Sequence, residues 1–190
     1  MKNLQTLCVF IVLLFSQISC SKSNDLYMKD NNIYFNGKQL TGENADRSPI
    51  FVEQRNVVFF IRDIKNNDIS CNGIAEQKII EYDLKTDKEK TIINYKAITG
   101  YSESGYEIER APFVDTLIYS NSATYFYYNL FPSYCSGELS QIHKFDFVNT
   151  TDIELFYGKL KAIIDKGKYK DKLVALILYP ILHLSAHKIQ

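Results

Sequence analysis

The chain has 190 residues, a length that suits one domain, and its 22 Lys and Arg side chains are balanced by 22 Asp and Glu side chains. A protein that tracks nucleic-acid phosphates shows clustered basic residues and a clear positive excess, so this charge balance excludes nucleic acid as the expected partner. The 14 Tyr and 12 Phe residues, without any Trp, favour short β-strands over helices.

Residues 1–19 have the pattern of an export signal. Lys2 provides a short charged start, and Leu7–Phe15 is an uninterrupted apolar run. A transmembrane helix needs about 20 apolar residues, so this run is too short to span a bilayer and fits the apolar core of a signal peptide. We therefore expect the mature protein to begin near residue 20.

Cys20 ends this leader. Ile18 and Ser19 before it resemble the lipobox of bacterial lipoproteins, although Gln17 stands where Leu is usual. The resemblance implies that lipid chains on Cys20 hold the protein on a membrane of the cell envelope, periplasmic or surface-exposed, with residues 20–30 as anchor and tether. The alternative is ordinary secretion, with cleavage nearby and Cys20 left as a free or paired thiol.

Residues 31–190 are expected to form one β domain. It opens with a hairpin signal at Ile33–Leu40, because Asn36-Gly37 accepts the positive φ angles of a tight primed turn. Four strand-like runs follow and predict an antiparallel four-stranded meander. These runs are Pro49–Val52, Val57–Arg62, Gln77–Tyr82 and Glu89–Ile93.

A second copy of this unit follows the first. Gln77 and Gln141 each lie six residues after a cysteine, and Tyr82-Asp83 matches Phe145-Asp146 at the turn into the last strand. Self-similarity of this kind indicates stacked sheet units. The strands expected for the second copy are Pro112–Tyr119, Tyr125–Asn129, Leu139–Phe145 and Ile153–Phe156.

The first unit has Arg47-Ser48-Pro49 ahead of its strands and Tyr82-Asp83-Leu84-Lys85-Thr86 at its closing hairpin. These motifs resemble the TolB-like, PD40-type β-propeller repeat, and Arg110-Ala111-Pro112 is a looser match in the second unit. The resemblance covers roughly residues 30–180 and implies propeller blades that contact proteins or ligands. A propeller usually has at least four blades, so two clear ones imply an incomplete or open propeller.

The C-terminal part of the chain allows two interpretations. Thr151 and Glu154 resemble a helix capping box, but Gly158 would lie inside that helix and the blade pattern requires a strand. We expect strands here. The wholly apolar Leu173–Tyr179 is expected to be a buried strand that ends before Pro180.

Cys71 and Cys135 are the cysteines that remain when the leader is removed and Cys20 carries lipid. In an oxidising envelope compartment they predict a disulfide, which requires their Cα atoms to come within about 7 Å. The alternative is two buried, unpaired thiols.

The histidines do not form a recognisable catalytic motif. His143 alternates with Ile142 and Lys144 and is expected on the surface of a strand. His183 and His187 fit a plain C-terminal tail better than a zinc site. We therefore expect no metal, no cofactor and no catalytic residue.

The densest aromatic stretch lies in the second unit, at residues 125–134. Because side chains alternate along a strand, Tyr125 and Tyr127 share one side. A sugar or a protein partner could stack on Tyr125, Tyr127 and Tyr134. The commoner arrangement, in which both faces pack between neighbouring blades, is the alternative.

Together these patterns favour a non-catalytic binding or interaction module of the cell envelope, with a protein or glycan partner. Recognition is expected in the long inter-strand segments 63–75, 94–110 and 130–138. One alternative is an envelope hydrolase or glycan-processing enzyme with an acidic loop site, and another is a degenerate copy without separate activity. The acids of the enzyme alternative are Asp63, Asp68, Glu103 and Glu107.

Overall fold

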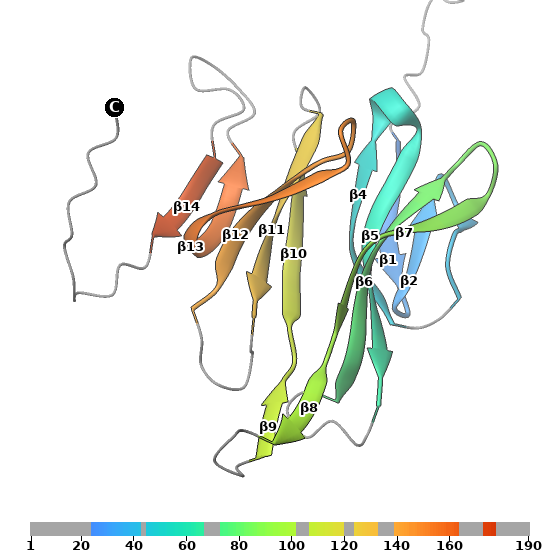
Figure 1. The fold of residues 1–190 in the computed structure, drawn as a ribbon. Helices are drawn as coiled ribbons and strands as arrows, with labels where there is room; N and C mark the ends of the chain where they lie inside the picture. The colour runs from blue at the N-terminus through green and yellow to red at the C-terminus, as the bar shows by residue number, and fades with distance from the viewer. Residues whose placement is uncertain are drawn as a thin grey trace, which may run out of the picture.

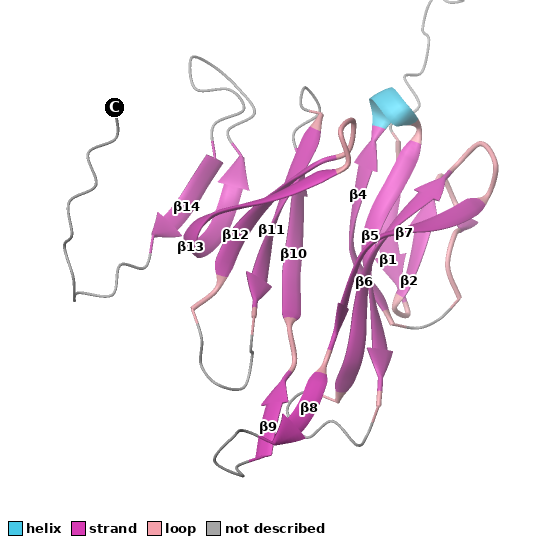
Figure 2. Cartoon of the chain, viewed as in Figure 1, coloured by secondary structure: helices cyan, strands magenta, loops and turns pink. Residues whose placement is uncertain are grey.

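The computed structural model describes residues 24–42, 45–66, 73–101, 107–119, 124–132, 139–163 and 173–177. Within these ranges the regular structure is antiparallel β-strand, except for one turn of 3-10 helix, η1, at Glu53–Arg55 (Figure 2). The expected all-β class is confirmed. No helix in this part of the chain is long and apolar enough to cross a membrane.

The described strands form three sheets and one separate hairpin (Figure 1). A small sheet contains β1 (Leu26–Lys29), β2 (Asn32–Phe35) and β3 (Lys38–Gln39). The first blade contains β4 (Asp46–Val52), β5 (Val57–Lys65), β6 (Ile74–Asp83) and β7 (Lys88–Lys96). The second blade contains β10 (Phe113–Tyr119), β11 (Tyr125–Phe131), β12 (Gln141–Asp146) and β13 (Thr151–Ile163), to which β14 (Leu173–Ile177) adds a fifth strand.

Both blades are meanders, in which each strand pairs antiparallel with the next strand of the chain. The two predicted four-stranded units are therefore confirmed, and so is the hairpin at Asn36-Gly37, where β2 pairs with β3. The small sheet begins at Leu26, ahead of residue 31.

The predicted repeat is visible in the turns that follow the third strand of each blade. The Asp83 carboxylate accepts hydrogen bonds from the backbone N–H groups two and three residues later, at 2.8 and 3.1 Å. Asp146 accepts the same pair at 2.9 and 3.1 Å. The fifth residue of each turn, Asp87 or Thr150, has a left-handed φ, at 54° and 57°. Matching sequence thus produces matching turns.

A hydrophobic core holds the two blades face to face. Phe59 of β5 is fully buried, and its ring lies 5.1 Å from that of Phe126 and 5.8 Å from that of Phe147. Residues of both blades, among them Ile79 and Val114, complete this cluster. Propeller blades pack against one another in the same face-to-face manner, so the arrangement is that of an open, propeller-like stack.

The other face of each blade is also covered. Ile33 and Leu40, from the small sheet and the residue after it, pack on Val58 and Phe60 of the first blade. Leu160 of β13, with residues of β14, packs on the outer face of the second blade. Figure 1 shows the resulting order, with the small sheet at one end, the first blade in the middle and the second blade at the other end.

Two expectations need correction, one about a connecting segment and one about the burial of a strand. Segment 94–110 is mostly strand rather than loop, because β7 is followed by a hairpin of β8 (Ile98–Tyr101) and β9 (Glu107–Arg110) that leads into the second blade (Figure 1). Strand β14 forms as expected within residues 173–179, but it is not fully buried, since Val174 is 41% exposed. It is an edge strand of its sheet, and among the described strands only β13 pairs with it.

We expect Phe59→Ala to lower the free energy of unfolding by about 3–5 kcal/mol, because it leaves a cavity between the two blades. Urea unfolding followed by far-UV circular dichroism measures this change. Val148→Ala is the control, since Val148 is 63% exposed and its loss should change stability by less than about 0.5 kcal/mol. Equal effects of the two substitutions would contradict the proposed core.

Candidate functional site

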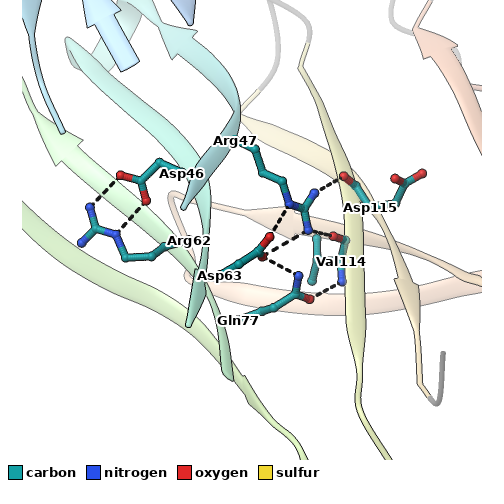
Figure 3. A network of polar contacts seen from close by, with 7 residues as sticks. All are labelled: Asp46, Arg47, Arg62, Asp63, Gln77, Val114 and Asp115. Carbon is teal, nitrogen blue, oxygen red and sulfur yellow. Dashed lines mark hydrogen bonds and ion pairs between the residues drawn. The ribbon is translucent and has the colours of Figure 1, made fainter. Parts of the chain in front are cut away.

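Arg47, on β4, bridges the two blades (Figure 3). Its Nε donates to Asp63 Oδ2 at 2.8 Å, within the first blade. Its Nη1 donates to the Asp115 carbonyl at 2.5 Å, and its Nη2 donates to the Val114 carbonyl, both on β10. One guanidinium thus joins the first strands of neighbouring blades, using the fixed fork of donors that Arg presents.

Gln77 completes this bridge from the other side. Its Nε2 donates to Asp63 Oδ1 at 2.7 Å, and its Oε1 accepts the Val114 backbone N–H at 2.6 Å. Figure 3 shows Arg47 and Gln77 converging on Asp63 while both reach β10. Gln77 is 1% exposed, so its amide satisfies polar groups that would otherwise be buried without partners.

A second arginine, Arg62, lies beside this bridge in the first blade and forms ion pairs with two carboxylates. Arg62 donates to both carboxylate oxygens of Asp46, at 2.7 and 3.0 Å, and also to both oxygens of Glu89. Burial alone would lower the pKa of Arg62, but the hydrogen bonds that it donates to the Asp46 and Glu89 carboxylates raise its pKa overall. The buried Asp46 carboxylate is thereby neutralised in a bidentate pair.

A cluster of ionisable side chains lies where β7 meets the second blade. The Tyr95 and Tyr128 hydroxyl oxygens are 2.8 Å apart, and Tyr128 donates to Asp152 Oδ2 at 2.8 Å. His143 Nδ1 lies 3.2 Å from the same Asp152 oxygen, and its ring stacks on that of Tyr128. Burial raises the pKa of Tyr95 to about 12, and burial with the neighbouring Tyr95 and Asp152 raises the pKa of Tyr128 further.

His143 is buried, so the expectation of a surface position is wrong. Strand β12 lies inside its sheet and is covered on both faces, by the first blade on one side and by the β13–β14 hairpin on the other. Its Nε2 is buried and has no hydrogen-bond partner among the described residues. Asp152 orients the ring through Nδ1. Because Nδ1 is paired and Nε2 is buried, neither ring nitrogen is left open to solvent, and the cluster packs at the interface between the blades.

Of the predicted binding tyrosines, Tyr125 and Tyr127 are described. Tyr127 is buried and packs with Ile142 and Leu160, while Tyr125 is partly buried and lies edge-on to Tyr127. The Nζ of Lys144 lies 4.0 Å from the centre of the Tyr125 ring. The accessible part of this predicted site is therefore small, and it lies around Tyr125.

Several predicted residues lie outside the described ranges, so their predictions stay untested. They are Cys20, Cys71, Cys135, Tyr134, His183, His187, Asp68 and Glu103.

The acids of the enzyme alternative are placed in part. Asp63 is held by Arg47 and Gln77 between the blades, rather than free in a loop. Glu107 belongs to β9. Within the described part of the chain, no group of three or more His, Cys, Asp or Glu side chains is placed to hold a metal ion.

Exposed apolar side chains gather on β13, the strand that carries the second blade into β14. Ile153, Leu155 and Tyr157 are 50%, 39% and 48% exposed. We call these three residues the β13 row. The sequence predicts a strand at Ile153–Phe156, which stops before Tyr157, and it does not indicate an exposed surface there. The signal it lacked was a bulge: Ile153 pairs with Lys144 but Tyr157 pairs with Gln141, so the register shift at Leu155 turns Ile153 and Tyr157 to opposite sides of the strand.

The chain matches no protein-family model, and comparisons with curated proteins and with solved structures return no significant match.

We expect Gln77→Leu to lower the free energy of unfolding by about 1–3 kcal/mol, because it leaves the Val114 N–H buried without an acceptor. Chemical denaturation measures the change. Gln141→Leu is the matched control, since Gln141 begins the equivalent strand of the second blade and is only partly buried. Equal destabilisation by the two variants would show that the hydrogen bond from Val114 to Gln77 adds nothing measurable to the free energy of unfolding.

Stability should fall between about pH 10 and pH 12, and part of this fall should come from Tyr95. Its pKa is about 12 in the folded chain against an ordinary 10.0, so in this range the folded state keeps a proton that the unfolded state releases. The contribution is complete below pH 10 and is lost as pH rises to about 12.

Denaturant titrations at pH 9 and pH 12 test this dependence. Tyr95→Phe should reduce the loss of stability by up to about 2–3 kcal/mol relative to the unchanged chain, whereas Tyr157→Phe, at an exposed position, should not. The interpretation is wrong if the free energy of unfolding falls by the same amount between pH 9 and pH 12 in Tyr95→Phe and in the unchanged chain.

Proposed function

We propose that this protein is a cell-envelope lipoprotein, anchored through an acylated Cys20, that acts as a non-catalytic interaction module for an envelope protein. The observation that carries the binding part of the proposal is the β13 row. Its three large apolar side chains are exposed close together along one strand, on both sides of it, and apolar side chains that cluster on a folded protein mark surfaces that another protein covers.

The position of the β13 row supports this function. The row lies on a strand of the second blade, whose β11 and β12 residues pack against the first blade through Phe126 and Phe145. Binding surfaces on a rigid β scaffold lose little conformational entropy when a partner binds. The Asp63 carboxylate, which an acidic catalytic site would need free, is used instead to join Arg47 and Gln77.

Partner binding can be measured by crosslinking in intact envelopes, followed by affinity capture of the protein. We expect one stoichiometric protein partner. Its yield should fall at least about tenfold with the double variant Ile153→Ser and Tyr157→Ser, since a few buried apolar or aromatic anchors carry most of the energy of an interface.

Val148→Ser is the matched control, because Val148 is exposed in the turn that precedes β13. Its capture yield should equal that of the unchanged protein. A partner retained by the double variant would reject the β13 row as the binding surface, provided that circular dichroism shows the variant to be folded.

Cys20→Ala tests the anchor separately. The variant should lose incorporation of labelled fatty acid and leave the membrane fraction, because two or more acyl chains are what hold such a protein stably. A variant that stays membrane-bound with the same lipid label would sink the anchor hypothesis.

A further inference from the structure

The small sheet presents an aromatic face away from the first blade. Tyr27 on β1 pairs with Tyr34 on β2, which pairs with Gln39 on β3, so these three side chains form one row across the sheet. The two Tyr rings are stacked, with centroids 5.2 Å apart and planes 5° apart. The Tyr34 hydroxyl donates to Gln39 Oε1 at 3.1 Å.

The opposite face of this sheet packs against the first blade. Leu26, Ile33 and Phe35 alternate with the row and pack against the first blade. The aromatic row therefore points outward because side chains alternate along a strand. Tyr27 is 36% exposed, and Lys29, which lies on the same side of β1, is exposed as well.

The chain places this face close to the proposed lipid anchor. Seven residues lead from Cys20 to Tyr27, a length that spans at most about 25 Å when fully extended. The stack of sheets puts the second blade, with the β13 row, at the end away from the small sheet (Figure 1). Among the sheet faces described, that of the small sheet is thus tied most closely to the bilayer.

The chemistry of the face fits the surface of a bilayer. Tyrosine combines an apolar ring with a polar hydroxyl and is enriched where one end of a side chain is apolar and the other wet, as at membrane interfaces. Exposed Lys29 and Asp30 follow Tyr27 and cancel in charge. The face therefore suits zwitterionic headgroups and requires no anionic lipid.

We propose that the outer face of the small sheet, through Tyr27 and Tyr34, rests on the lipid surface to which Cys20 is anchored. This inference rests on the proposed function, because the anchor supplies the proximity. It adds an orientation, in which the small sheet lies on the membrane and the β13 row points away from it toward a partner.

The absence of Trp from the chain permits a direct test with a single fluorophore. Tyr27→Trp is introduced into the full-length lipoprotein, which is purified with its own acyl chains and reconstituted in phosphatidylcholine vesicles with or without brominated acyl chains. We expect bromine to quench the fluorescence at least about twofold, with little dependence on salt. Tyr157→Trp, on the β13 row, is the matched control and should not be quenched.

Mass spectrometry of the N-terminal peptide separates the possible failures. Acylated Cys20 with Tyr27→Trp unquenched overturns the docking face and leaves the anchor intact. Equal quenching of both variants overturns it too, because the protein then lies on the membrane without preference. An unacylated Cys20 rejects the anchor itself, and the docking inference with it. A spectral shift of unquenched Tyr27→Trp with chitooligosaccharide would identify a glycan platform instead and reject the lipid surface.

Discussion

The packing of Phe59 against Phe126 and Phe147 is the contact on which the arrangement of the two blades depends. An antiparallel sheet cannot bury an apolar face by itself, so each apolar face must pack against another layer. The first blade meets the second through these rings, and it meets the small sheet through Val58 and Phe60. The middle sheet is therefore apolar on both faces, which explains the run Val57–Ile61 in β5.

Apolar packing is not directional, so it leaves open how far one blade can slide over the other. The contacts of Arg47 and Gln77 with the β10 backbone remove this freedom, because each hydrogen bond specifies one register between the blades. Leaving any member of such a buried network unpaired is costly. The polar bridge thus selects one geometry from those that the aromatic core would accept.

Much of the fold follows from local sequence, and the functional surfaces do not. Alternating apolar residues and turn chemistry at Asn36-Gly37 and Asp83 specify the strands and their order, because these signals act within a few residues. The burial of His143 could not be predicted this way, since its ring stacks on Tyr128 on the face of β12 that packs against the first blade. Periodicity reports which side a residue faces, and not whether another layer lies there.

The candidate site shows the same limit. Arg47 was singled out as part of a repeat motif, but its contact with β10 joins residues 67 and 68 positions apart in sequence. Tyr125 and Tyr127 could have formed an aromatic surface or packed between layers, and in the structure Tyr127 is buried against Leu160. Long-range packing decides which members of an aromatic strand remain accessible.

The two equivalent turns differ in one residue that matters for dynamics. Asp87 and Thr150 both adopt a left-handed backbone, which Asp tolerates and a β-branched residue resists, at a cost of order 1–3 kcal/mol. The hairpin of β12 and β13 is therefore the weaker copy of the repeat and the more prone to local opening. Loss of structure in the repeat should therefore begin at this turn, ahead of the equivalent turn of the first blade.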